Sequence, residues 1–203
     1  YREGPDASGD IYISELQGKT WTKPVLINKD FQTKVLETGA TMTPDGLTLY
    51  FSAEAVDGKT GKDIYKSTRT ESTGWGKPER LSDVINTKGD EDFPLIWLDG
   101  KTMLFSSTGH QSMGGLDVFA SMKNSESEEF SKPINMGYPI NSVYDDYNLA
   151  ITCDAKTAYM AAVRDSGLGD YDIYKVQFEK PILPTSLTWV QGRGITNLGT
   201  PAK

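Results

Sequence analysis

Short apolar segments separated by turn residues recur along the chain, and residues 91–136 show the pattern most fully. The first apolar segment there ends in a Leu-Asp-Gly turn, and the next is rich in residues that favour strands. A glycine-rich loop and two further strand-like segments follow, and Pro133 in the last one fits an edge position. The pattern predicts four antiparallel strands, at residues 91–97, 102–106, 117–121 and 130–136.

Three motifs repeat along the chain at one common step of 53 to 55 residues. The triplet Asp-Ile-Tyr, or its variant Asp-Val-Phe, begins at Asp10, Asp63, Asp117 and Asp172. An Asp-Gly or Asp-Ala turn followed by a strand begins at Asp45, Asp99 and Asp154. The motif Trp/Phe-x-Lys-Pro begins at Trp21, Trp75 and Phe130. Three motifs that keep one register indicate an internal repeat of about 54 residues.

The repeat predicts an all-β fold, because four antiparallel strands per unit, arranged radially, make a β-propeller. A β-solenoid needs shorter coils, and a helical repeat needs apolar spacing near 3.6 residues, so neither fits. We expect residues 1–179 to hold three whole repeats and parts of others, which leaves the propeller incomplete in this chain. Residues 180–186 are expected to form a proline-containing linker, and residues 187–203 the start of a small β-sandwich.

The composition excludes several kinds of partner and binding site. The net charge is −7 and Lys and Arg are not clustered, so no nucleic-acid partner is expected. The sequence has one cysteine, Cys153, and one histidine, His110, which excludes an intrachain disulfide and a Cys/His metal site. No run approaches the ~20 apolar residues of a membrane helix. We expect no metal, no cofactor and no transmembrane segment.

One side of the propeller is expected to be acidic. Because strand direction alternates, the loop before each first strand and the loop between the second and third strands emerge on the same side. Glu37, Glu91 and Asp146 hold equivalent positions there. They form either an acidic ring for a cation or a basic partner, or a set of carboxylates that accept local backbone N–H groups. The other candidate binding residues are His110, Gln111, Tyr147 and Arg164.

The repeated residues favour a structural role, because an active site needs one specialised constellation and not several copies. An aspartate after a glycine-containing loop can accept backbone N–H groups and fix the turn. Aromatic residues at the repeat spacing are expected to pack between adjacent blades. The residues with these expected roles are Asp10, Asp63, Asp117, Asp172, Tyr12, Tyr65, Phe119, Tyr174, Trp21, Trp75 and Phe130.

The sequence Pro-Asp-Gly-Leu-Thr-Leu-Tyr-Phe-Ser at residues 44–52, with Asp-Ile-Tyr and Trp-x-Lys-Pro, resembles the WD-like repeat of TolB-type propellers of the bacterial envelope. The tail from residue 187 is similar to the start of a carboxypeptidase-regulatory-like domain. This domain order resembles Bacteroidota outer-membrane lipoproteins of the OmpA family, including the PorE component of type IX secretion. The resemblance implies a periplasmic, outer-membrane-associated scaffold, with any peptidoglycan-binding domain outside this chain.

Three functions remain as alternatives. The first is a noncatalytic envelope scaffold that binds other envelope proteins, and peptidoglycan through another domain. The second is a glycan- or peptide-binding propeller. The third is the propeller domain of a hydrolase, whose Gly-x-Ser-x-Gly elbow would stand elsewhere. No serine or cysteine motif accompanies His110, so a catalytic triad has no support and we expect no enzyme activity.

Overall fold

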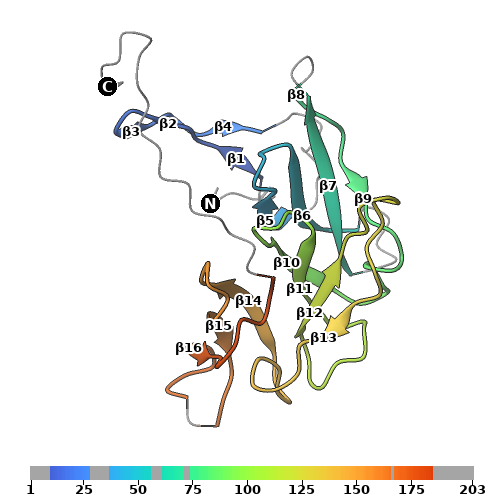
Figure 1. Cartoon of the computed structure of the whole chain (residues 1–203), viewed down its shortest axis with the longest axis vertical. Coiled ribbons are helices and arrows are strands. Elements are labelled where there is room, and N and C mark those ends of the chain that lie inside the picture. The colour runs from blue at the N-terminus through green and yellow to red at the C-terminus, as the bar shows by residue number, and fades with distance from the viewer. Residues whose placement is uncertain (1–9, 28–36, 56–60, 71–73, 166, 185–203) are drawn as a thin grey trace, which may run out of the picture.

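The computed structural model describes residues 10–27, 37–55, 61–70, 74–165 and 167–184, and every regular element in them is a β-strand (Figure 1). The all-β expectation is therefore confirmed. The expected linker falls partly, and the expected small β-sandwich entirely, outside the described residues. No helix in the described part of the chain has the length and apolar character needed to cross a membrane.

Three antiparallel sheets follow one another along the chain (Figure 1). The first contains β5 (Glu37–Met42), β6 (Thr48–Glu54) and β7 (Lys62–Thr70), with β8 (Gly74–Trp75) and β9 (Glu79–Arg80) both paired to β7. The second contains β10 (Glu91–Ile96), β11 (Thr102–Ser107), β12 (Asp117–Met122) and β13 (Ile134–Asn135). The third contains β14 (Asp146–Ile151), β15 (Thr157–Ala162) and β16 (Asp172–Gln177).

The N-terminal strands form the outer half of a further unit. β1 (Tyr12–Ile13) pairs with β4 (Val25–Leu26), and β2 (Leu16–Gln17) pairs with β3 (Thr20–Trp21). The pair Tyr12↔Leu26 has the register of Tyr65↔Arg80 in the first sheet and Phe119↔Asn135 in the second. The described residues thus hold two complete units, a three-stranded unit and half of another. The expectation of three whole repeats is not tested, because the segment one repeat step after residues 130–136 lies outside the described residues.

The tight turns of the repeat explain one of its sequence preferences. Gly46 and Gly100 lie at the same turn in the first and second sheets, with φ of +72° and +68°. Only glycine adopts this region without a steric cost. The third sheet has Ala155 at this position, also with a positive φ of 53°. The turn geometry is therefore kept although the third repeat departs from the Asp-Gly motif.

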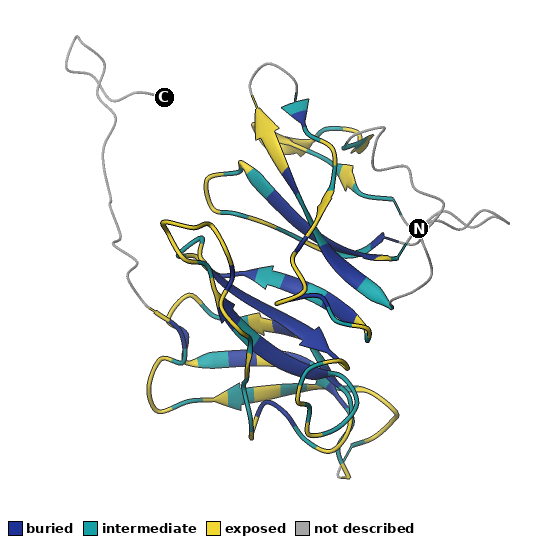
Figure 2. Cartoon of the chain, turned by 90° about the vertical axis from the view of Figure 1, so that its right-hand side faces the viewer, coloured by how far each residue is buried: buried dark blue, intermediate teal, exposed yellow. Residues whose placement is uncertain are grey.

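Neighbouring sheets pack face to face through apolar side chains, as the buried strands in Figure 2 show. The innermost strand of each unit contacts the sheet before it: β10 contacts β5, β6 and β7, and β14 contacts β10, β11 and β12. One core cluster joins the first and second sheets, from Tyr50 and Ile64 to Phe105, Phe119 and Phe130. The large buried area of such aromatic residues makes them the main source of hydrophobic stabilisation.

A buried asparagine completes the edge of each of the first two sheets. Asn86 accepts a hydrogen bond from the Ile64 N–H (2.7 Å) and donates to the Ile64 carbonyl (2.9 Å). Asn141 does the same for Val118, at 2.8 Å in both directions. Buried backbone groups need such partners. The Ile-Asn pair that repeats at residues 85–86 and 140–141 is the sequence signal for this device.

The repeated aromatic residues do not all pack between sheets. Trp75 and Phe130 are buried, and Phe119 lies in the core between the first two full sheets. Tyr12 and Trp21 are instead 52% and 69% exposed. Among the described residues, no sheet packs on the side of β1–β4 that faces away from β5, so nothing covers these two rings. The expectation of inter-blade packing is therefore not tested for these two rings, because the described residues contain no sheet on that side.

Candidate functional site: the loop face

The two sets of loops do meet at one end of the sheets. The Thr108 N–H donates to the Asp90 carbonyl (3.0 Å), and the Thr108 Oγ1 atom accepts the Asp90 N–H (2.9 Å). In the third unit the Asp145 carboxylate accepts the Leu116 N–H (2.9 Å). We call this surface, made of residues 85–93, 108–116, 141–147, 163–165 and 167–171, the loop face.

The carboxylate of Glu91 points inward and is buried. It accepts hydrogen bonds from the Thr87 N–H (2.7 Å), the Thr87 hydroxyl (2.8 Å) and the Ser107 hydroxyl (2.6 Å). Burial raises the pKa of Glu91, although these hydrogen bonds act in the opposite direction. Its equivalent in the first sheet, Glu37, is buried as well. Neither side chain presents a carboxylate to solvent.

Asp146 repeats this arrangement one unit later. Its buried carboxylate accepts the Ser142 N–H (2.6 Å) and the Ser142 hydroxyl (2.9 Å), and it forms an ion pair with Arg164 (2.6 Å). The Arg164 guanidinium also lies 5.5 Å from the centroid of the Tyr174 ring. The structure thus brings Asp146 and Arg164 together as an internal pair, which leaves neither charge free for a ligand.

His110 and Gln111 lie in the loop between β11 and β12. The His110 Nε2 atom is 2.9 Å from the Ile85 carbonyl oxygen, and its ring contacts Phe105 and Phe119. The Gln111 carbonyl accepts a hydrogen bond from the Asn135 side chain (3.2 Å), while its own side chain is exposed. His110 therefore ties two loops together, and Gln111 remains accessible on the loop face.

Tyr147 is the predicted site residue that lies in an accessible cluster. Its ring stacks on Phe93 of the second sheet, with centroids 5.1 Å apart, and meets Tyr171 edge-on at 5.3 Å. Phe93 has a positive φ of 51° at the bulge in β10. Asn148, one repeat step later at the bulge in β14, has a positive φ of 56° as well, so this conformation belongs to the repeated bulge. We call Phe93, Tyr147 and Tyr171 the aromatic row.

Two tyrosine hydroxyls of the loop face donate to carboxylates. The Tyr171 hydroxyl donates to Asp145 (3.1 Å), and the Tyr144 hydroxyl donates to Asp165 (2.7 Å). These carboxylates raise the pKa of both phenols, because a hydrogen bond and a negative charge favour the protonated phenol. Tyr144 and Tyr171 are exposed. Sequence reasoning missed Phe93 and Tyr171, because neither repeats at the 54-residue step.

The loop face presents aromatic rings beside carboxylates. Aromatic faces bind apolar, planar or cationic groups, and the adjacent carboxylates accept N–H and O–H donors. The described residues contain no group of three or more His, Cys, Asp or Glu side chains placed to hold a metal ion. The buried carboxylates of Glu91 and Asp146 are engaged with local hydroxyls, amides or Arg164, and that of Asp92 is paired with Lys62.

The repeated aspartates hold the loops of this face. Asp117 accepts the Met113 N–H, and Asp172 accepts the Leu168 N–H (2.7 Å), four residues upstream in each case. Asp63 instead forms a two-point ion pair with Arg80, at 2.8 and 3.0 Å. Each carboxylate therefore bonds to its own unit and stabilises the loop or edge beside it.

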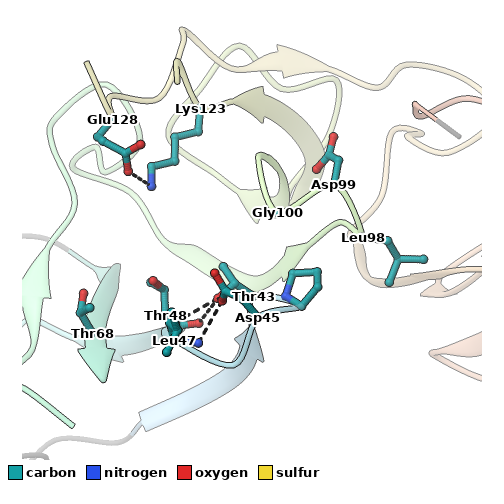
Figure 3. Close-up of a pocket in the computed structure, with 11 residues that line it drawn as sticks. Thr43, Asp45, Leu47, Thr48, Thr68, Leu98, Asp99, Gly100, Lys123 and Glu128 are labelled. Carbon is teal, nitrogen blue, oxygen red and sulfur yellow. Dashed lines mark hydrogen bonds and ion pairs between the residues drawn. The ribbon is translucent and has the colours of Figure 1, made fainter. Parts of the chain in front are cut away.

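A polar groove of about 500 Å³ lies on the opposite end of the sheets, between the turns of the first two units (Figure 3). Its carboxylates are occupied: Asp45 accepts the Thr43 hydroxyl and the Leu47 N–H, and Glu128 is paired with Lys123. The hydrogen bonds lower the pKa of Asp45. Because its polar groups bond to one another, the groove offers few directed contacts to a ligand.

The geometry above can be compared with known proteins. No family model matches the sequence, and no curated protein matches it. Among solved structures, an Agrobacterium tumefaciens protein assigned as TolB aligns with a TM-score of 0.51, at 16% identity over 76% of this chain and 48% of that one. TolB from Acinetobacter baumannii aligns with a TM-score of 0.51, at 18% identity over 85% of this chain and 36% of that one.

The sequence identity to either structure is too low for its function to be assigned to this chain. The chain spans less than half the length of either structure. They agree with the repeat, with the four-stranded units and with the stacking of sheets through their innermost strands. The chain has a TolB-like β-propeller fold.

Proposed function

We propose that this chain is a noncatalytic interaction propeller of the bacterial cell envelope, and that it binds other envelope proteins through the loop face. The TolB-like fold and the repeat motifs support an envelope role. The paired state of Glu91, Asp146 and Arg164 supports binding over catalysis, because none of them is available as a free acid or base. The alternative is the propeller domain of a hydrolase, in which another domain would carry out the hydrolysis. No contact among the described residues of the loop face supports this alternative.

The more specific part of the proposal concerns place and assembly. We propose a periplasmic, outer-membrane-associated protein, a lipoprotein of the OmpA-family type known from Bacteroidota, that links a secretion or envelope complex to peptidoglycan. Its support is the likeness of residues 44–52 to the WD-like repeat and of the tail to a carboxypeptidase-regulatory-like domain. Peptidoglycan contact would belong to a domain outside this chain.

The observation that carries the proposal is the aromatic row with its adjacent carboxylates. Phe93, Tyr147 and Tyr171 come from two units, and Asp145 adds an acceptor beside them. A peptide with basic and aromatic side chains matches both features, and the net charge of −7 favours a basic partner. The same row favours a glycan as the second candidate, since sugar rings stack on aromatic faces while their hydroxyls donate to carboxylates.

Peptide and glycan arrays probed with the purified chain separate these candidates. Tyr171→Ser removes an exposed ring from the row, and Tyr159→Ser removes an exposed tyrosine on β15 as the matched control. We expect array binding to be lost with Tyr171→Ser and kept with Tyr159→Ser. Binding that is indifferent to both substitutions, or turnover of an array substrate, contradicts the proposal.

A further inference from the structure

A second, smaller pocket lies next to the polar groove of Figure 3 and is lined by residues of the first two sheets. Its volume is about 240 Å³, and it shares Lys123 and Glu128 with the groove. Its apolar part is lined by three buried residues, Tyr50, Leu81 and Phe130. The rings of Tyr50 and Phe130 meet edge-on there, with centroids 5.9 Å apart. We call this hollow the Tyr50 pocket.

The hydroxyl of Tyr50 is a donor without a hydrogen-bond partner in the described part of the chain. Tyr50 is 1% exposed, and its burial, followed by the negative charges of Glu128 and Asp45, raises its pKa to about 12. The phenol therefore stays protonated at neutral pH. The effect of Glu128, which lines the same pocket, indicates that the hydroxyl faces the pocket. Because buried polar groups normally have a partner, this hydroxyl indicates a ligand that brings an acceptor.

Positive charge from both sheets converges beside this hydroxyl. Lys123 forms an ion pair with Glu128, and this pair lowers the pKa of Glu128. Lys66 and Lys101 lower the same pKa further, so the Glu128 carboxylate lies in the field of three ammonium groups. Lys66, which also lines the pocket, is paired with Glu79 at 3.4 Å. The Glu128 carboxylate thus marks a position that suits an anion.

Glu128 can leave this position at little cost. Its side chain is 66% exposed, on the turn between β12 and β13, whereas the Lys123 side chain is only 21% exposed. The Glu79 side chain is 70% exposed. Ion pairs with such exposed partners contribute little to stability, because water solvates the freed carboxylate. An incoming carboxylate can therefore replace Glu128 on Lys123 and accept the Tyr50 hydroxyl from within the pocket.

We propose that the Tyr50 pocket binds a small carboxylate ligand with an aromatic or apolar stem, and that Glu128 occupies the carboxylate position when the ligand is not bound. Lys123 supplies the charge and the Tyr50 hydroxyl a hydrogen bond, while Leu81 and Phe130 contact the stem. Hydrogen bonds to a charged acceptor are stronger than those between neutral groups. The pocket is separate from the loop face, and the inference holds independently of the proposed function.

The test uses benzoate as the probe and benzamide, its uncharged isostere, as the control. Each is titrated into the isotope-labelled chain at constant ionic strength, and the chemical shifts are followed by NMR. We expect saturable shifts at Tyr50, Lys123 and Glu128 with benzoate, and binding of benzamide that is weaker by about tenfold or more. A flat response to benzoate, or equal binding of both probes, overturns the proposal.

Tyr50→Phe keeps the ring and removes only the hydroxyl. It should weaken benzoate binding about tenfold, because one hydrogen bond to a charged group is lost. It should not lower the stability of the free chain, since the hydroxyl has no partner in the described part of the chain. Unchanged benzoate affinity in Tyr50→Phe contradicts the assigned role of the hydroxyl.

Glu128→Gln removes the competing carboxylate from Lys123 and should tighten benzoate binding severalfold. The matched control is Glu126→Gln, which removes the same charge from an exposed position on the same turn, outside the lining of the pocket. Because exposed charges are screened, this control should change the affinity by less than about twofold. Equal tightening by the two variants would show a general effect of charge and contradicts displacement of Glu128.

Discussion

Asn141 bonds to both backbone groups of Val118: its Oδ1 accepts the Val118 N–H and its Nδ2 donates to the Val118 carbonyl, each at 2.8 Å. The side chain therefore acts as a short piece of strand at the end of β12. Asn86 and Ile64 show the same relationship one unit earlier.

Asn141→Ala should destabilise the chain by about 2 to 4 kcal/mol, because it leaves two buried backbone groups without partners. Urea denaturation followed by tryptophan fluorescence measures the change. Gln111→Ala, which removes an exposed side chain, is the control and should stay within about 0.5 kcal/mol of the parent chain. A small effect of Asn141→Ala would show that water replaces the asparagine.

Arg164→Met should cost about 3 to 5 kcal/mol, because it leaves the buried Asp146 carboxylate without its cation. The matched control is Lys66→Met, which breaks the exposed pair with Glu79 and should cost at most about 1 kcal/mol. Thermal or urea unfolding measures both. Adding Asp146→Asn to Arg164→Met should recover part of the loss, and a failure to do so would contradict the ion-pair explanation.

Glu91 gives the chain a pH dependence of known sign. Burial raises its pKa in the folded state above the ordinary 4.5, so the folded chain holds its proton more tightly than the unfolded chain. The contribution of Glu91 to stability is therefore fully present below the ordinary pKa and declines as pH rises through the raised one. The difference in unfolding free energy between the parent and Glu91→Gln should fall over that window, while Glu126→Gln, at an exposed position, should show no such trend.

The phenols of Tyr144 and Tyr171 should have a higher pKa than an ordinary tyrosine. Spectrophotometric titration of Tyr144 should show a lower pKa after Asp165→Asn, because the substitution removes the negative charge that favours the protonated phenol. The pKa of Tyr171, whose partner is Asp145, should not change in that variant. A shift of both phenols together would show that the two carboxylates act as one site.

Gly46→Ala should destabilise the turn between β5 and β6 by about 1 to 2 kcal/mol, because alanine at this positive φ strains the backbone. An added Cβ at Gly46 would meet no neighbouring atom, so backbone strain is the whole expected cost. Gly169→Ala is the control, since Gly169 also has open space around it but no positive φ. Urea unfolding distinguishes the two. Equal effects at both sites would contradict the assigned turn geometry.

The sequence predicted the part of this structure that repeats. Asp-Ile-Tyr, the Asp-Gly turn and Trp/Phe-x-Lys-Pro mark strands and turns that recur, so the four-stranded units could be placed from spacing alone. Phe93 and Tyr171 could not be found in this way, because each stands at a position where other repeats have a different residue. The inward direction of Glu91 depends on Thr87 and Ser107, which become neighbours only when β10 pairs with β11.

The exposure of Trp21 and Ile173 could not be predicted from the sequence either. Trp75 and Phe130, the equivalents of Trp21, are buried, and so are Ile64 and Val118, two equivalents of Ile173. The motif alone predicts the same burial for every copy. Their exposure depends on which sheets lie next to them in space. A repeat thus reveals the internal contacts of each unit, while the faces of the terminal units require the three-dimensional arrangement.

The central claim, that the loop face is the interaction surface of a noncatalytic propeller, is tested most directly by photo-crosslinking in living cells. A photoreactive amino acid replaces Leu168, which is fully exposed on the loop face, or Leu47, which is exposed at the opposite end of the sheets. The account predicts a discrete crosslinked envelope protein from position 168 and none from position 47, with loss of the product when Tyr171→Ser is added. A crosslink from position 47 alone, or no crosslink from position 168, contradicts it.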